Sequence, residues 1–248
     1  WPLSNKNLPK QFLNIKSKDS LLIETTKRLK NSLYMPATFI GSYDHRFLIK
    51  NNLDKENIIY DSILLEPTPK NTMASITLGA LKISEKDSNA IIIVLPADQI
   101  IEKKKEFNSE VQKIVNACDL KSIYTFGIKP NSPSSEFGYI KKGKIINSKN
   151  NIYKISSFSE KPNSDLAKKY LETGDWFWNS GIFIFSLKAL LDEIELCSSK
   201  LLNNFVDIYN ERKSDLFFEF FNSKKFLSLK TDSFDIEIME KTKNGYVK

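Results

Sequence analysis

An aspartate follows the most apolar run of the chain, in the segment Ile91-Ile-Ile-Val-Leu-Pro-Ala-Asp98. The β-branched residues of this run are typical of a buried strand, and Pro96 would end it. Asp98 would then lie at the carboxyl edge of a sheet, where α/β proteins bind their ligands. A single carboxylate at such an edge suits Mg²⁺, a cation that also binds substrate phosphates. The spacing fits equally well with Asp98 capping the helix that follows.

A second carboxylate, Glu66, comes after another apolar run and before a helical pattern from Met73 to Ser84. Asn71 or Thr72 is a suitable N-cap for that helix, whose N-terminus offers free N–H groups to an anion or a base. The Glu66 carboxylate could accept the two hydrogen bonds that guanine donates. Taken alone, the segment fits better with a turn followed by a capped helix.

Candidate recognition residues also lie next to three other predicted strands. Lys161 could neutralise a sugar phosphate and Glu160 could bind sugar hydroxyls, although by themselves they fit better with a solvated turn. Asn179, in Trp-Asn-Ser-Gly, can both donate and accept hydrogen bonds, as sugar recognition requires. Gly138, followed by a tyrosine, opens a strand in a similar small-then-aromatic arrangement.

Near the start, Lys10 lies in Leu-Pro-Lys-Gln-Phe and could bind phosphate as a point charge, although it is one lysine among many. His45 is the only histidine, and a structural or surface role is the expectation for it. Neither a CxxC nor an HExxH pattern occurs, which argues against a zinc site. A serine hydrolase is excluded because the sequence has no GxSxG.

Composition narrows the class of partner. The formal net charge of +7 raises nucleic acid as a partner, but the lysines are scattered, and Lys103 to Lys105 is their densest cluster. A phosphate-rich small substrate would benefit from the same positive field, so no nucleic-acid partner is expected. The longest apolar run, Ile91 to Leu95, is too short to span a bilayer, so no membrane partner is expected either. Cys118 and Cys197 lie far apart without pairing partners, which indicates a reducing, cytoplasmic location.

Short β-branched runs alternate with amphipathic segments, a pattern typical of a mostly parallel sheet covered by helices. We expect one continuous α/β domain over residues 1–248, with a helical extension after about Lys188. The predicted strands are Ala37–Gly41, Ile58–Leu64, Ile91–Leu95, Tyr124–Ile128, Gly138–Lys141, Ile152–Phe158 and Gly181–Phe185.

Taken in order, these segments resemble one family, the mannose-1-phosphate guanylyltransferases among the sugar nucleotidyltransferases. The resemblance covers essentially the whole chain, and it rests on many moderate motifs in register. These are Trp1-Pro-Leu-Ser with Leu8-Pro-Lys-Gln-Phe12, Glu66-Pro with Asn71-Thr72, LPAD ending at Asp98, Thr125-Phe-Gly-Ile, Gly138-Tyr-Ile, Glu160-Lys-Pro, Trp178-Asn-Ser-Gly and Met239-Glu-Lys241.

The resemblance implies a Rossmann-like nucleotide-diphospho-sugar transferase fold, with a mixed, mostly parallel central sheet flanked by helices. It implies transfer of GMP from GTP to mannose 1-phosphate, with Mg²⁺ as cofactor and Asp98 as metal ligand. Lys10, Asp98 and Lys161 would be catalytic, and Glu66, Asn71 and Thr72 would bind the nucleotide. The sugar phosphate would be bound by Gly138, Glu160, Lys161 and Asn179.

Two expected segments do not occur in the sequence: a glycine-rich GGxGTRL stretch ahead of Trp1, and a Trp-Asp-Val-Gly segment beyond Lys248 with a second metal-binding aspartate. We expect truncation or disorder at both ends to account for this. Gln99 stands where a histidine is common, and Lys70 replaces an arginine. Another base or sugar, or a non-catalytic nucleotide-sugar sensor on the same fold, is the alternative function. The sequence leaves a homodimer open.

Overall fold

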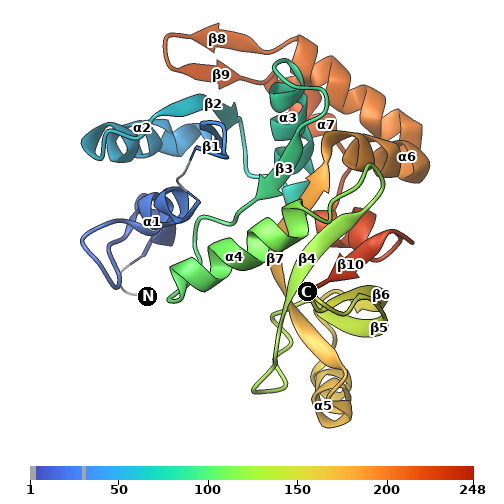
Figure 1. Ribbon diagram of the computed structural model, residues 1–248. Coiled ribbons are helices and arrows are strands. Elements are labelled where there is room, and N and C mark those ends of the chain that lie inside the picture. The colour runs from blue at the N-terminus through green and yellow to red at the C-terminus, as the bar shows by residue number, and fades with distance from the viewer. Residues whose placement is uncertain (1–3, 30–31) are drawn as a thin grey trace.

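Two sheets organise the part of the chain that the computed structural model describes, residues 4–29 and 32–248. The smaller sheet has the order β1-β2-β9-β8 (Figure 1). Its first three strands run parallel, and β8 pairs antiparallel with β9 at the edge. Its strands are β1 (Ala37–Ser42), β2 (Tyr60–Glu66), β8 (Lys213–Asp215) and β9 (Phe218–Phe220).

The larger sheet has the order β3-β7-β4-β10-β6-β5, and the long strand β7 also pairs with β5. Most of its pairs are antiparallel; β10 runs parallel to β4 and antiparallel to β6. The C-terminal strand is therefore inserted inside this sheet. The strands are β3 (Ile91–Val94), β4 (Ile123–Ile128), β5 (Tyr139–Asn147), β6 (Ile152–Ser159), β7 (Trp176–Ser186) and β10 (Gly245–Val247).

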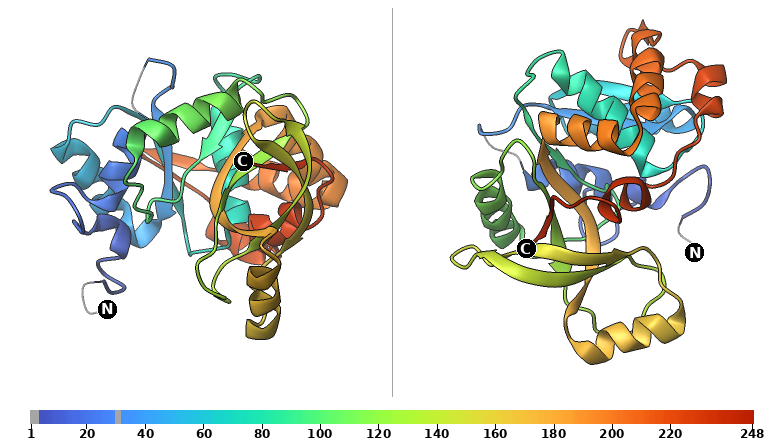
Figure 2. Two further views of the ribbon diagram at one scale, coloured as in Figure 1. Left: turned by 60° about the horizontal axis from the view of Figure 1, so that its bottom comes forward. Right: turned by 90° about the vertical axis from the view of Figure 1, so that its right-hand side faces the viewer.

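Helices pack around both sheets, with α1 and α2 at one end of the molecule and α5 beyond β5 and β6 at the other (Figures 1 and 2). Four of them begin at a side-chain N-cap: Ser20 for α1, Asn163 for α5, Ser186 for α6 and Asn222 for α7. The helices are α1 (Leu21–Arg28), α2 (Arg46–Lys55), α3 (Thr72–Ser84), α4 (Lys104–Val115), α5 (Ser164–Thr173), α6 (Leu187–Asn210) and α7 (Ser223–Ser228). Shorter turns are the 3-10 helices η1 (Lys10–Phe12) and η2 (Tyr43–His45) and the π-helix η3 (Asp235–Met239). No helix in the described ranges is long and apolar enough to cross a membrane.

The two faces of β2 pack against different hydrophobic clusters. Leu64 belongs to a large cluster with residues of α3, α6 and β7, whereas Ile63 and Leu65 belong to a cluster with residues of α1 and α2. Because side chains alternate along a strand, Glu66 lies on the same face as Leu64, toward α3. The hydrophobic pattern of this strand therefore decides which way the carboxylate at its end points.

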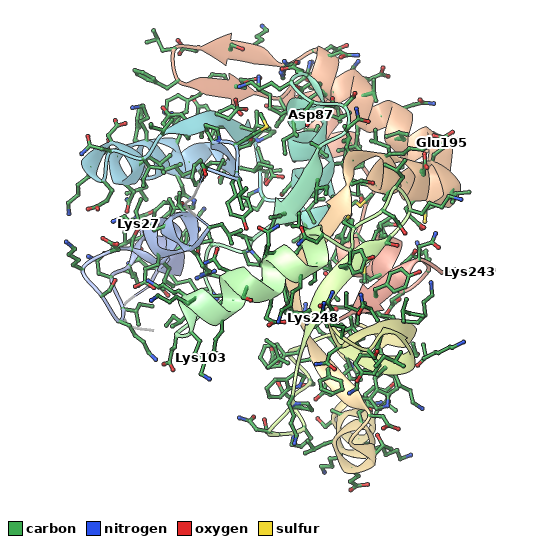
Figure 3. All side chains as sticks on the ribbon, viewed as in Figure 1. Lys27, Asp87, Lys103, Glu195, Lys243 and Lys248 are labelled. Atoms are coloured by element: carbon green, nitrogen blue, oxygen red, sulfur yellow. The ribbon has the colours of Figure 1, made fainter. Side chains whose placement is uncertain are left out.

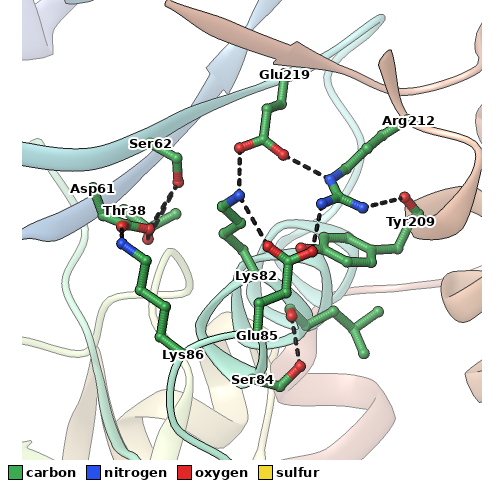
Figure 4. Close-up of polar contacts among 11 residues, drawn as sticks. Thr38, Asp61, Ser62, Lys82, Ser84, Glu85, Lys86, Tyr209, Arg212 and Glu219 are labelled. Carbon is green, nitrogen blue, oxygen red and sulfur yellow. Dashed lines mark hydrogen bonds and ion pairs between the residues drawn. The ribbon is translucent and has the colours of Figure 1, made fainter. Parts of the chain in front are cut away.

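An ionic network connects α3 to the segment that leads into the smaller sheet (Figure 4). Glu219 on β9 accepts from Lys82 at 2.7 Å and from the Nε of Arg212 at 2.6 Å. Glu85 also contacts both cations. The carboxylate of Glu219 and both cations are largely buried, so each charge depends on its partners. This network connects β9 to α3.

The α/β class and the mixed sheet predicted from the sequence are confirmed, and all seven predicted strands occur. Two details differ. The mostly parallel pairing expected for the central sheet is wrong for the larger sheet, whose described pairs are antiparallel except β10 with β4; the parallel pairs β1–β2 and β2–β9 belong to the smaller sheet. The region after Lys188 is not purely helical, since β8, β9 and β10 follow α6. These strands are three residues long, and such a short run carries little periodicity to detect. The single domain over residues 1–248 stays a prediction.

Candidate functional site

Asp98 lies in the turn after β3, and its carboxylate pairs with Lys10. The distance from Lys10 Nζ to Asp98 Oδ2 is 2.7 Å, and both side chains are partly exposed. Lys10 begins η1, which is anchored by the buried ring of Phe12. Helix α4 begins at Lys104 with Lys103 as its N-cap, so Asp98 does not cap this helix. The structure thus supports the sheet-edge interpretation of Asp98 over the capping one.

The surroundings of Asp98 fit a metal that arrives with a substrate. No group of three or more His, Cys, Asp or Glu side chains that could hold a metal ion occurs within the described residues. Mg²⁺ does not require such a group, because it is commonly bound through one or two carboxylates together with substrate phosphates and waters. The single carboxylate of Asp98 is compatible with this mode of binding, and Mg²⁺ stays a prediction.

Glu66 ends β2 and is 6% exposed. Its Oε1 accepts a hydrogen bond of 2.8 Å from the hydroxyl of Ser75 in the first turns of α3. Burial raises the pKa of Glu66 to about 7, and the Ser75 hydrogen bond opposes that rise only in part. Once ionised, a carboxylate near a helix N-terminus can accept two donors from a ligand, and the side chain of Glu66 is already largely out of water.

Asn71 and Thr72 occupy the start of α3, as predicted, but their side chains bind the C-terminal part of the chain. Asn71 is the N-cap residue by position, yet its side chain makes no cap hydrogen bond and instead donates to the carbonyl of Thr231 at 3.1 Å. The hydroxyl of Thr72 accepts from the backbone N–H of Phe234 at 3.0 Å. The N-terminus of α3 therefore lacks a side-chain cap of its own, which leaves it suited to an anion or a base.

Asn179 lies on β7, and four contacts fix its position. Its backbone N–H donates to the carbonyl of Gly138 at 2.7 Å. Its side-chain Oδ1 accepts from Thr125 Oγ1 at 2.9 Å and from the N–H of Gly181 at 3.3 Å. Its Nδ2 donates to Asp235 Oδ1 at 2.6 Å. Asn179 is thus held rigidly by β4, its own strand and η3.

Glu160 and Lys161 follow β6 and lie against Gly138. A Cβ atom at Gly138 would come within 2.6 Å of Glu160 Oε2, so the glycine makes room for the carboxylate. Lys161 Nζ lies 3.2 Å from Glu160 Oε1. The backbone of Lys161 has φ +43°, a left-handed conformation that non-glycine residues rarely adopt and that often occurs at functional sites.

Contacts connect the predicted residues into one site. The Asp98 turn reaches β7 because the side chain of Gln99 donates to the carbonyl of Ser180, next to Asn179. Residues Phe234 and Asp235 join the two halves, since Phe234 binds Thr72 and Asp235 binds Asn179. Tertiary structure thus brings the predicted nucleotide-binding and sugar-binding residues together through the C-terminal segment.

Sequence reasoning missed two acidic residues of this segment. Asp235 binds Asn179, and burial together with the charge of Glu160 raises the pKa of Asp235 to about 6. Glu240 Oε1 accepts from the backbone N–H of Glu160 at 3.0 Å. Glu240 belongs to the Met-Glu-Lys motif, and Asp235 precedes that motif within Ser-Phe-Asp. The motif was the available signal, but it gave no indication of which residues it would contact.

Other features lie outside the site. A hollow of about 400 Å³ has none of the predicted site residues in its lining, which consists of Tyr43, Leu65, Pro67, Lys213, Phe220, Phe221 and Ser223. His45 Nε2 contacts the carbonyl of Lys6 at 2.9 Å on an exposed surface, in keeping with a surface role. Figure 3 shows Lys27, Lys103 and Lys243 well separated from one another, which agrees with dispersed positive charge.

The chain matches a family model described as nucleotidyl transferase over residues 1–223. The match includes Trp1 to Leu3, a part of the predicted signature that lies outside the described residues. A mannose-1-phosphate guanylyltransferase of Escherichia coli is 33% identical over 252 residues, covering 100% of this chain and 54% of the relative. The chain therefore spans about half the length of the curated relatives it matches. The family resemblance inferred from the motifs is confirmed.

Two solved structures share the fold. A Helicobacter pylori crystal structure titled mannose-6-phosphate isomerase has a TM-score of 0.86 at 26% identity and covers 97% of this chain and 92% of its own. A Thermus thermophilus crystal structure titled mannose-1-phosphate geranyltransferase has a TM-score of 0.82 at 24% identity and covers 100% of this chain and 69% of its own. The second likeness bears on the fold alone.

Proposed function

The chain belongs to the nucleotidyl transferase family, and from this premise we propose that it transfers GMP from GTP to mannose 1-phosphate. The products would be GDP-mannose and pyrophosphate. The observation that carries the proposal is the pair of contacts from neighbouring residues, Phe234 to Thr72 and Asp235 to Asn179. Through them Thr72, a predicted nucleotide-binding residue, and Asn179, a predicted sugar-binding residue, both contact the same segment, which supports one site for the two substrates.

In the proposed reaction, an oxygen of the sugar phosphate attacks the α-phosphorus of GTP, and the bond from that phosphorus to the bridging oxygen of pyrophosphate breaks. No general base is needed, because the attacking phosphate is already ionised at neutral pH. Lys161 would hold the attacking phosphate, and Lys10 would stabilise the departing pyrophosphate. Asp98 would hold Mg²⁺, which would supply charge neutralisation and Lewis acidity.

Guanine specificity is assigned to Glu66. The ring N–H and the exocyclic amino group of guanine both donate, and a carboxylate can accept from both. Adenine lacks this pair of donors, so the same carboxylate would remain unpaired and disfavour it. The short distance between Glu66 and Ser75 on α3 supports this assignment, because it keeps the carboxylate beside the helix N-terminus where the nucleotide would bind.

The test is pyrophosphate release in the presence of Mg²⁺, with GTP, ATP, UTP and dTTP each paired with mannose 1-phosphate and glucose 1-phosphate. Turnover selective for GTP and mannose 1-phosphate is the expected result. Turnover with a different pair would overturn the specificity and keep the reaction class. Absence of turnover with every pair, combined with binding of a nucleotide sugar in calorimetry, would favour a non-catalytic sensor.

The homodimer and the cytoplasmic location stay predictions. Analytical ultracentrifugation of the purified protein would test the first, and fractionation of cells would test the second. Neither bears on the assignment of residues within the site.

A further inference from the structure

The side chain of Asn179 has little capacity left for a ligand. Its Oδ1 accepts two hydrogen bonds, from Thr125 Oγ1 and from the N–H of Gly181. An amide oxygen has two lone pairs, so these donors use its accepting capacity. Its Nδ2 gives one of two N–H groups to Asp235. Asn179 can therefore offer a ligand one N–H donor, whereas the sequence suggested a side chain that both donates and accepts.

Asp235 determines this arrangement. The N–H of Gly181 can only donate, so it selects the oxygen of the Asn179 amide, and Asp235, an acceptor at 2.6 Å, selects the nitrogen. Loss of Asp235 would leave the amide held on one side only. A charge-assisted hydrogen bond of this length is stronger than a neutral one.

The backbone around Asp235 is built to hold its carboxylate in place. Phe234 is fully buried, and its ring packs 4.7 Å from that of Phe183 on β7. Asp235 then begins the π-helix η3, in which the N–H of Glu240 donates to the carbonyl of Asp235 at 2.9 Å. π-Helical turns are rare in proteins, and those that occur are often found at functional sites.

We propose that Asp235 is a positioning residue for the sugar half of the site, which fixes Asn179 as a donor to a hydroxyl of the hexose 1-phosphate. This inference rests on the proposed function. With Asn179 limited to donation, the sugar hydroxyls need another acceptor, and the carboxylate of Glu160, 3.2 Å from Lys161 Nζ, can supply one. The sugar hydroxyls thus meet one amide donor and carboxylate acceptors, an arrangement that can discriminate between epimers.

The test compares Asp235→Ala and Asp235→Asn with wild type, using whichever nucleotide and sugar phosphate the wild-type protein turns over best. Asp235→Ala is expected to raise KM for the sugar phosphate about tenfold or more while KM for the nucleotide changes less than about twofold. Asp235→Asn keeps the volume and an accepting oxygen, so it should recover part of the loss. Asp232→Ala is the matched control, because Asp232 is an exposed aspartate on the same segment. It should behave as wild type.

A double-mutant cycle with Asn179→Ala distinguishes positioning from a general structural role. If Asp235 acts through Asn179, the two losses in sugar-phosphate KM will be strongly non-additive. Additive losses, or equal rises in both KM values, would overturn the proposal. If Asp235→Ala does not fold, the same comparison is made with Asp235→Asn, and an unchanged sugar-phosphate KM in that variant would overturn it as well.

Failure of the proposed function is a separate result. It would show as wild-type turnover with another substrate pair, for which the Asp235 comparison still applies. If wild type turns over no pair, calorimetric titration with GDP-mannose replaces the kinetics. Asp235→Ala should then weaken binding of GDP-mannose about tenfold and leave binding of GDP unchanged, and Asp235→Asn should recover part of that loss. Equal weakening of both ligands would reject the inference.

Discussion

Lys10 Nζ lies 2.7 Å from Asp98 Oδ2, so two residues far apart in the sequence form one ion pair at the carboxyl end of β3. The proposed mechanism needs both a cation for the leaving pyrophosphate and a carboxylate for a metal at this place. Because both side chains are partly exposed, the pair adds little to folding and can separate at small cost when phosphates bind.

Replacement of Asp98 should therefore affect activity and leave the fold unchanged. We expect Asp98→Asn to lower kcat for pyrophosphate release at least about a hundredfold, because charge neutralisation around the transferring phosphorus is lost. The melting temperature should stay close to that of wild type. Steady-state kinetics with Mg²⁺ and a thermal unfolding curve measure the two quantities.

A neighbouring ion pair supplies the control for Asp98→Asn. Lys16 and Glu102 also connect the N-terminal segment to the stretch after β3, and both side chains are exposed. Glu102→Gln should leave kcat and the melting temperature unchanged. Equal losses of activity in the Asp98 and Glu102 variants would show that activity depends on the contact between the N-terminal segment and the stretch after β3, and not on the Asp98 carboxylate itself.

Glu66→Gln should change how stability depends on pH. The pKa of Glu66 is about 7 in the folded protein, above its ordinary value of 4.5 in an unfolded chain. The folded state thus holds a proton that the unfolded state releases, so wild-type stability falls as pH rises from about 4.5 to about 7. Above pH 7 the loss of stability caused by the buried, ionised Glu66 reaches its full size of about 3 kcal/mol.

The glutamine variant lacks this titration, so it should match wild type near pH 4 and exceed it by up to about 3 kcal/mol at pH 8. Urea unfolding at several pH values measures the difference in the free energy of unfolding. A difference in the free energy of unfolding between the two proteins that does not change with pH would mean that Glu66 does not titrate in this range.

Binding of GTP should ionise Glu66, because guanine donates to the carboxylate form. The ratio of the GTP affinity of wild type to that of Glu66→Gln is then expected to rise about tenfold between pH 6 and pH 8. Glu66→Gln is the matched control, since the phosphates of GTP titrate identically with both proteins. The Glu66→Gln substitution should also weaken binding of GTP more than binding of mannose 1-phosphate. Calorimetry in buffers of different ionisation enthalpy counts the protons released, and equal release by both proteins would contradict base reading by Glu66.

Glu219→Gln should destabilise the fold, because it removes the carboxylate shared by Lys82 and Arg212. These side chains are largely buried, so we expect a loss of about 2 kcal/mol in the free energy of unfolding. Glu211→Gln is the control, since Glu211 pairs with Lys225 on the exposed surface and should leave stability unchanged. Equal effects of both substitutions would indicate that the network in Figure 4 adds no more than a surface pair.

The sequence predicted the individual strands and the residues at their ends because both signals are local. The apolar run before Asp98 and the one before Glu66 each define a strand and the position of a carboxylate after it. The three-residue strands β8, β9 and β10 escaped prediction, since β9 and β10 pair with strands far away in the chain and β8 pairs with the neighbouring β9.

The sequence alone thus determined the α/β class, the family resemblance and the types of chemistry available at the candidate positions. Tertiary structure decided how those positions combine. Only folding could show that Asp235 binds Asn179 while Phe234 binds Thr72, because hydrogen bonds between distant segments leave no periodic pattern in a single chain. Only folding could show that Glu66 is buried and has a raised pKa, because burial depends on which elements pack over a residue and not on its neighbours in sequence.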